Sequence, residues 1–285
     1  GFYWHHEPHG GDHFKAYHWP GFVSGEAYDE QRFLREMRRR AFAIRGMAEP
    51  PLEAPAAPEI VEVTPGGLVT WRGSAGASGY DVERAGAAGE DWRTAAHGVS
   101  DAAFQYRPLW ADEEIKPGKS YRYRVTARNE AGASEPSPPF GPVTMTLRTL
   151  VDELANDSRF FLAKGSLEFR GDEARKYKED TTGLVGSDDS AVIYTTDAPM
   201  TGGRVWAFSQ TAADHLRFAV SADGRTFSPF EADPTATASG DTASYGYWQP
   251  VRYGLSGLPG DTRYLRIGLP GGTMRLSRVE LDIGE

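Results

Sequence analysis

The chain contains no cysteine, so disulfide bridges, thiolate metal ligands and cysteine nucleophiles are all excluded. It also lacks any apolar run approaching the ~18 residues that a membrane-spanning helix requires. Positive charge is scarce: 31 lysines and arginines stand against 40 acidic residues, for a net charge of -9. This balance argues against nucleic acid as a partner. Proteins that bind nucleic acid neutralise its phosphates with Lys and Arg side chains and so release the counterions held there. Neutral or cationic partners fit better.

What is present is the composition of an ordinary globular protein. Hydrophobic residues make up 39% and charged residues 25% of the 285 positions, which suits two or three domains. The chain begins at Gly1 and enters at once the apolar run Phe2, Tyr3, Trp4, with no initiator methionine. We therefore expect it to be a piece of a longer protein.

Residues 24–46 are expected to form one amphipathic helix. The apolar residues spaced by three and four are Ala27, Phe33, Leu34, Met37, Ala41 and Ile44. A single helix after one short strand cannot bury this stripe by itself, because a stable domain needs a second packed layer. Residues 47–58, rich in proline and alanine, then predict a stiff, extended linker.

Residues 59–147 are expected to form short alternating strands separated by Gly, Pro and Asp turns, in the pattern of an antiparallel sandwich. The predicted strands are EIVEV, GLVTW, GYDVERA and SYRYRVTARN. The segment resembles a fibronectin type III domain. The resemblance rests on Trp71, on IKPGKSY ending at Tyr121, and on RNEAGASEPS at residues 128–137. Modules of this type in bacterial polysaccharide hydrolases are mostly spacers, so Trp71 and Tyr121 are interpreted as structural.

Residues 148–285 are again expected to be all β. The order LRFAVSADGRTFSPF, YWQPVRYGL, TRYLRIGLPGG and RLSRVELDI resembles the discoidin or galactose-binding jelly rolls, many of which are carbohydrate-binding modules. Tyr245, Tyr247 and Trp248 follow a Gly- and Thr-rich loop and suggest a platform for stacking sugars, with Trp206 and Arg252 behind them. A structural role is favoured for Trp206, whereas both roles stay open for Trp248.

Metal binding is a weaker hypothesis for two segments. Residues 5–22 hold five of the seven histidines, but their spacing matches no known metal signature. His6, Glu7 and His9 superficially suggest HExxH, yet the second histidine comes too early and Pro8 forbids the helix. A structural Ca site at Asp188 and Asp189 is possible, although a solvated turn is favoured. No other cofactor is expected.

A short strand, a loop dense in His, Trp and Tyr, and one helix form the pattern of the last β/α unit of a TIM barrel. YHWPGF followed by a helix ending AFAIRG resembles the C-terminal end of family 5 glycoside hydrolases of clan A, in particular mannanases and endoglucanases. That resemblance implies that Trp4 stacks on the sugar in the cleavage subsite. It also implies a group of residues lining the cleft: His5, His6, His9, Asp12, His13 and Trp19.

In the family that this segment resembles, the two catalytic glutamates lie on the fourth and seventh barrel strands, which would come before this chain. Glu7 and Asp12 match neither position. These enzymes are retaining, with a carboxyl pair ~5 to 5.5 Å apart. The resemblance implies that the chain derives from a hydrolase of O-glycosyl bonds, and we do not expect this chain to hydrolyse anything alone.

The fold expected is thus mainly β, with a fibronectin III-like sandwich and a jelly roll preceded by the last β/α unit of a TIM barrel. The expected division is 1–46 barrel unit, 47–58 linker, 59–147 fibronectin-like domain and 148–285 binding module. The function expected is the C-terminal portion of a secreted, bacterial-type β-glycan hydrolase whose partners are β-mannan or β-glucan and its own missing barrel. The alternatives are a cell-surface adhesion protein and a metal-binding protein using the histidine loop.

Overall fold

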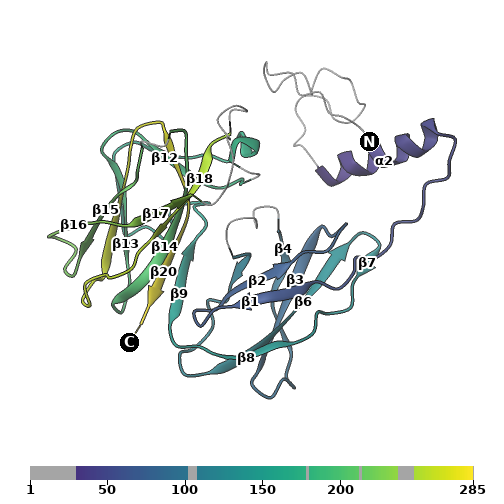
Figure 1. Cartoon of the computed structure of the whole chain (residues 1–285), viewed down its shortest axis with the longest axis horizontal. Coiled ribbons are helices and arrows are strands. Elements are labelled where there is room, and N and C mark those ends of the chain that lie inside the picture. The colour runs from purple at the N-terminus through teal and green to yellow at the C-terminus, as the bar shows by residue number, and fades with distance from the viewer. Residues whose placement is uncertain (1–29, 102–107, 178–179, 212–213, 237–246, 285) are drawn as a thin grey trace. The chain divides into compact units, whose positions relative to one another are not determined.

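The computed structural model describes residues 30–101, 108–177, 180–211, 214–236 and 247–284 (Figure 1). The chain divides into two compact units, Gly1–Glu53 and Ala54–Glu285. The predicted barrel strand and histidine-rich loop lie outside the described residues. Their interpretation as a barrel unit therefore stays a prediction.

The described part of the first unit begins with the helix α2, Glu30–Ile44, inside the range expected to be helical. Glu36 pairs with Arg39 at 2.7 Å and with Arg40 at 2.6 Å, one turn further along. The hydrogen bonds from these guanidinium groups lower the pKa of Glu36 to about 2. Ile44, at the end of the apolar stripe, is 83% exposed.

The first half of the second unit is an antiparallel sandwich, here called the N-terminal sandwich. One sheet has the order β1 (Glu59–Val63), β2 (Leu68–Arg72), β5 (Trp110–Ala111). The other has the order β4 (Arg93–Val99), β3 (Gly79–Gly86), β6 (Ser120–Asn129), β7 (Gly132–Ala133), and β8 (Phe140–Thr144) also pairs with β6. The bounds of β1 and β6 are those of the predicted strands EIVEV and SYRYRVTARN.

Its core lies between these two sheets, and Trp71 is part of it. Trp71 on β2 packs against Tyr80 on β3, with ring centroids 5.4 Å apart. On β6 the alternation places Tyr123 and Val125 in the core and the neighbouring arginines on the opposite face. The structure therefore gives Trp71 the packing role expected for it.

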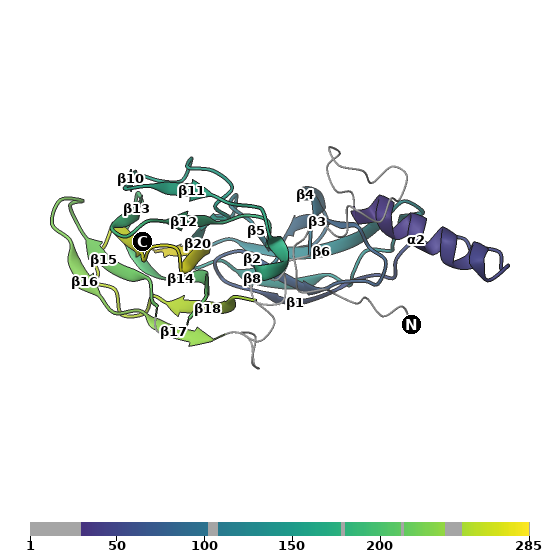
Figure 2. The same ribbon diagram turned by 90° about the horizontal axis from the view of Figure 1, so that it is seen from above.

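The second half is another antiparallel sandwich, here called the C-terminal sandwich. The five-stranded sheet has the order β10 (Leu162–Lys164), β13 (Ser190–Thr195), β19 (Tyr264–Leu269), β15 (Arg217–Ser221), β16 (Ser228–Phe230). The seven-stranded sheet has the order β11 (Leu167–Phe169), β12 (Leu184–Gly186), β20 (Met274–Ile283), β14 (Met200–Ser209), β18 (Gln249–Gly254), β17 (Asp233–Ala236), and β9 (Arg148–Asp152) also pairs with β20. Figure 2 shows β14, β18 and β17 side by side.

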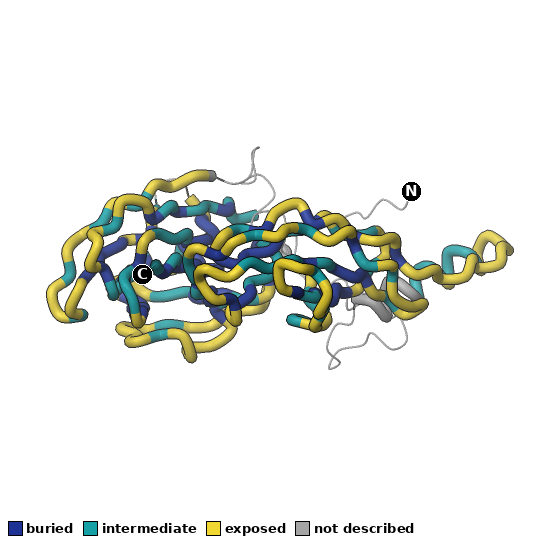
Figure 3. The backbone as a smooth tube through the Cα atoms, turned by 90° about the horizontal axis from the view of Figure 1, so that it is seen from below, coloured by how far each residue is buried: buried dark blue, intermediate teal, exposed yellow. Residues whose placement is uncertain are grey.

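The core of the C-terminal sandwich is built from the facing sides of these two sheets. Val192 and Ile267 come from the five-stranded sheet, and Val205, Leu276 and Val279 come from the seven-stranded sheet. Buried backbone runs through the strands of both sandwiches, with exposed residues concentrated in the connections (Figure 3). The expectation of a mainly β chain with two antiparallel sandwiches is confirmed.

The Ser-x-Asp-Gly sequence after β15 forms a tight turn. Asp223 accepts backbone hydrogen bonds from Thr226 at 2.9 Å and Arg225 at 2.8 Å, and these bonds lower its pKa to about 2. Gly224 has a φ of +70°, and a Cβ there would lie 2.9 Å from the Tyr264 ring. Both the backbone conformation and the close ring require glycine.

A fully buried arginine fixes the segment before β12 onto the seven-stranded sheet. The guanidinium of Arg275 lies 4.2 Å from the ring centroid of Tyr177, in the 3-10 turn η2 (Ala174–Tyr177). Its Nη2 donates to the carbonyl oxygens of Arg170 at 3.0 Å and Asp180 at 3.2 Å. A Cβ at Gly183 would lie 2.6 Å from the Arg275 Cζ, so the absence of a side chain there makes room for the guanidinium.

Candidate functional site

The candidate site lies on the face of the seven-stranded sheet that points away from the core, here called the outer face. Because side chains alternate along a strand, the residues between the core positions of β14, β18 and β20 share this face. Trp206 on β14 stands opposite Arg252 on β18 and Arg278 on β20. The sheet register thus brings an indole and two guanidinium groups together in one row.

Trp206 is held within this row. The guanidinium carbon of Arg252 lies 5.8 Å from its ring centroid, within the range of a cation–π contact. The residue is only 7% exposed, yet it lies outside the hydrophobic cluster between the sheets. Its indole Nε1 is buried and has no hydrogen-bond acceptor in the part of the chain that the structure describes.

A buried ion-pair network continues the outer face along β20. Glu280 accepts from the Nε of Arg204 at 2.7 Å and from the Nε of Arg278 at 2.8 Å. The Nη1 of Arg278 also pairs with Glu153, whereas its Nη2 is buried without an acceptor among the described residues. Two neighbouring buried donors, this Nη2 and the indole of Trp206, therefore lack a protein acceptor.

Trp248 lies immediately before β18, at one end of this face. It is half-buried, and its ring meets that of Tyr177 edge to face, with centroids 5.3 Å apart at 75°. Its backbone N–H donates to the carbonyl oxygen of Lys176 at 3.1 Å. Tyr177 in turn packs on Phe208 of β14, with centroids 5.6 Å apart. Trp248 is thus anchored in its place by a turn distant in the sequence.

The remaining members of the expected platform are placed in part. Tyr247 is half-buried beside Trp248 and precedes the same strand, whereas Tyr245 lies outside the described residues. Sequence reasoning missed Tyr177 and the Arg278–Glu280 pair. The sequence does contain a signal for the Arg278–Glu280 pair, because charged and apolar residues alternate along RLSRVELDI. Nothing in the sequence near Tyr177 indicates its contact with Trp248.

The residues expected to line a sugar cleft all fall outside the described residues: Trp4, His5, His6, His9, Asp12, His13 and Trp19. Among the residues that are described, no group of three potential metal ligands of the His, Asp or Glu kind gathers in one place. At the suggested Ca position, the Asp188 Oδ1 accepts from the Gly271 N–H at 2.7 Å, and Asp189 has a φ of 68°. Within the same residues, no helix has the length and apolar character needed to cross a membrane.

Comparison with known proteins gives no family. No protein-family model and no curated protein matches the chain. Among solved structures, the C-terminal CBM6 of LamC, a laminarinase of Zobellia galactanivorans, matches with 15% identity over 47% of this chain and 98% of its own, at a TM-score of 0.29. The CBM51-2 and INT domains of Clostridium perfringens ZmpB match with 10% identity over 60% of this chain and 39% of theirs, at a TM-score of 0.27.

Domains A168–A170 of titin match with 23% identity over 33% of this chain, at a TM-score of 0.24. The chain spans about a third of that titin structure and of the twitchin kinase region from C. elegans, 32% and 33% respectively. At such identities and TM-scores these likenesses carry no argument about function. The assignment of two antiparallel sandwiches rests on the strand pairing itself.

Proposed function

We propose that the chain is the C-terminal portion of a secreted modular β-glycan hydrolase, an endo-β-1,4-mannanase or endoglucanase. In this proposal residues 1–46 complete a catalytic barrel, 47–58 are a linker, 59–147 are a spacer domain and 148–285 bind polysaccharide. The observation that carries it is the anchored, half-buried Trp248 at the end of the outer face.

A half-buried indole held from one side suits a sugar. Its flat apolar face complements the C–H face of a pyranose, and its N–H remains able to donate a hydrogen bond. The edge-to-face contact with Tyr177 leaves at least one indole face uncovered by that ring. Because the contact and the Lys176 backbone bond fix Trp248 beforehand, little side-chain freedom is lost on binding.

Arg252 adds directional donors to this platform. It lies four residues beyond Trp248 on β18, where the alternation returns side chains to the same face. Its guanidinium forms no ion pair with any described residue and rests on Trp206. A guanidinium with free N–H groups donates hydrogen bonds to hydroxyl oxygens such as those of a sugar.

Catalysis is assigned to the rest of the longer protein. Residues 1–46 resemble the end of a family 5 barrel. In this proposal they form part of the cleft wall and include neither of the two catalytic glutamates. We therefore expect this chain to bind β-mannan or β-glucan and to leave both polymers intact. Release of reducing ends from mannan or glucan by the purified chain would contradict the assignment.

Affinity gel electrophoresis with soluble mannan or mixed-linkage β-glucan tests the binding. We expect retardation of the wild-type chain and about a tenfold loss of affinity in Trp248→Ala, the size of an aromatic stacking contribution. Trp248→Tyr, which keeps an aromatic face, should retain most of the retardation. Thermal unfolding of each variant shows that the sandwich still folds.

Trp92→Ala is the matched control, because Trp92 is also half-buried but belongs to the N-terminal sandwich, under the Arg124 guanidinium at 4.4 Å. Its loss should leave the retardation unchanged. Equal retardation of the wild-type chain and Trp248→Ala would refute the platform. Absence of retardation on every glycan would favour the adhesion alternative.

A further inference from the structure

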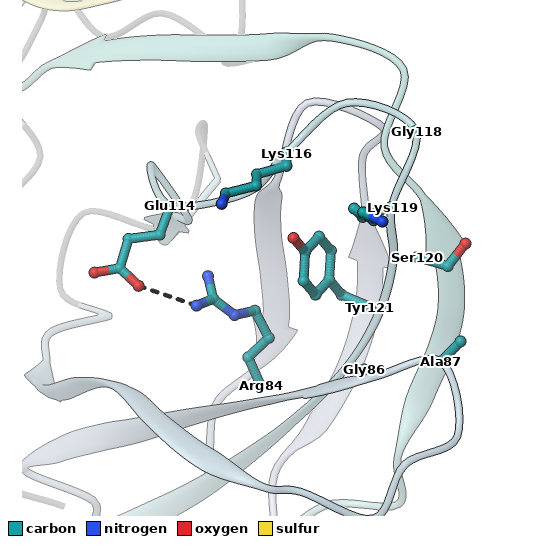
Figure 4. Close-up of a pocket in the computed structure, with 9 residues that line it drawn as sticks. All are labelled: Arg84, Gly86, Ala87, Glu114, Lys116, Gly118, Lys119, Ser120 and Tyr121. Atoms are coloured by element: carbon teal, nitrogen blue, oxygen red, sulfur yellow. Dashed lines mark hydrogen bonds and ion pairs between the residues drawn. The ribbon is translucent and has the colours of Figure 1, made fainter.

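The N-terminal sandwich carries a hollow of its own, between the end of β3 and the start of β6. Its volume is about 720 Å³, within the ~300 to 1,000 Å³ typical of small-ligand sites. The lining residues with ionisable side chains are Arg84, Glu114, Lys116, Lys119 and Tyr121 (Figure 4). Three of them are cationic and one is acidic.

The base of the hollow is held rigidly. The Nη1 of Arg84 donates to both carboxylate oxygens of Asp112, at 2.6 and 2.7 Å, and Asp112 is only 2% exposed. The Nη2 of Arg84 donates to Glu114 at 3.0 Å. The same guanidinium lies 5.3 Å from the ring centroid of Tyr121, so the ring and the cation fix one another.

A Pro-Gly turn places the two lysines of the hollow together. The Lys119 N–H donates to the Lys116 carbonyl oxygen at 3.1 Å, and Gly118 between them has a φ of +79°. Proline followed by a glycine with positive φ is the sequence of a type II turn, whose first and last Cα atoms lie less than ~7 Å apart. The two lysine side chains therefore start from neighbouring Cα atoms, and Figure 4 shows them on opposite sides of the Tyr121 ring.

The charge of this hollow is opposite to that of the chain. Asp112 compensates Arg84, whereas neither Lys116 nor Lys119 forms an ion pair with a described residue. The chain as a whole carries -9. A polyanion is repelled by such a protein at long range, so an anionic ligand would need a local cationic site of this kind.

We propose that this hollow binds a carboxylate-bearing sugar unit, a uronate, with its ring against Tyr121 and its carboxylate between Lys116 and Lys119. Glu114 stands across the opening and is 80% exposed, which excludes a second anionic group on that side and accepts from sugar hydroxyls instead. The orientation of the unit is thereby set. The site is separate from Trp248. Through it the spacer domain would bind acidic glycans or the acidic side branches of a neutral glycan.

Isothermal titration with oligogalacturonate tests the proposal, using fully methyl-esterified oligogalacturonate as the matched probe. The wild-type chain should bind the free acid at least about tenfold more tightly than the ester, and less tightly as salt is raised. The double variant Lys116→Glu/Lys119→Glu should lose at least about tenfold in affinity for the free acid. Both lysines are exposed, so folding should be preserved.

The double variant Lys164→Glu/Arg225→Glu controls for net charge, because it reverses two exposed cations of the C-terminal sandwich. It should bind oligogalacturonate as the wild-type chain does. Equal binding of acid and ester, full affinity in Lys116→Glu/Lys119→Glu, or an equal loss in the control would each overturn the proposal. Trp248→Ala should leave oligogalacturonate binding unchanged, which separates this site from the mannan or glucan platform.

Discussion

Strands β6 and β20 carry similar patterns of arginines and meet opposite surroundings. On β6 the arginines that alternate with core residues stay partly exposed, and Arg124 pairs with Glu83 of β3 at 2.8 Å. On β20, Arg275 and Arg278 are at most 1% exposed, and Glu280 is completely buried. β6 has one buried face, whereas both faces of β20 are covered.

The difference shows that alternation reports which residues share a face, not whether that face meets water. The Arg275 guanidinium is covered by Tyr177, which arrives from a turn about a hundred residues earlier in the chain. Once the outer face is covered, each charge must find partners or pay a large desolvation penalty. In the network of Arg204, Arg278 and Glu280 each charge has an oppositely charged partner, although the Nη2 of Arg278 has no acceptor among the described residues.

The largest effect is expected from Arg278→Ala. Removing this guanidinium leaves Glu280 buried with one cation in place of two, and such losses destabilise proteins by ~3 to 5 kcal/mol. Calorimetry should show the C-terminal sandwich melting earlier while the N-terminal sandwich is unchanged. If the melting temperature fell no more than it does when a surface arginine is removed, the buried ion pairs of β20 would not contribute more to stability than exposed ones.

High pH should produce the next largest effect. In both sandwiches burial raises the pKa of tyrosines, and in the N-terminal sandwich these are Tyr80 and Tyr123 of its core. Burial and the hydrogen bond to Asp101 raise the pKa of Tyr80 to about 12 from 10.0, and burial also raises the pKa of Tyr123. The unfolded chain loses these protons first, so the stabilisation is complete below pH 10 and is lost as the pH rises through 12.

Urea unfolding at a series of alkaline pH values, followed in the N-terminal sandwich, measures this loss. Tyr80→Phe has no proton to release and should flatten the dependence on pH. Tyr247, half-buried before β18, supplies the control because Tyr247→Phe should leave the N-terminal transition as it is. An unchanged slope in Tyr80→Phe would contradict the assigned cause.

The smallest effect is expected from Arg124→Ala on β6. This arginine pairs with Glu83 while both side chains are partly exposed, and such pairs contribute ~0.2 to 1 kcal/mol. The melting temperature of the N-terminal sandwich should shift slightly, and less at high salt. A loss comparable to that of Arg278→Ala would abolish the contrast between the two strands.

The sequence predicts the strands well and the covering contacts badly, for a physical reason. Strands such as β1 and β6 are recognised by alternating residues between Gly, Pro and Asp turns. The observed bounds of both strands are those predicted. The approach of Tyr177 to Trp248 depends on how the 3-10 turn folds back over the sheet, which no local pattern encodes. The roles of Trp4 and the histidines rest on a family resemblance and stay a prediction.

The close approach of Gly183 to Arg275 also constrains how this sandwich can change during evolution. The guanidinium and the backbone carbonyl oxygen of Leu276, 2.8 Å from such a Cβ, both occupy the space that a side chain at position 183 would need. A shorter residue at 275 would remove the cation on Tyr177 but would leave the carbonyl oxygen in place. Related chains that keep the arginine should therefore keep the glycine, and the glycine should also persist in chains that have lost the arginine.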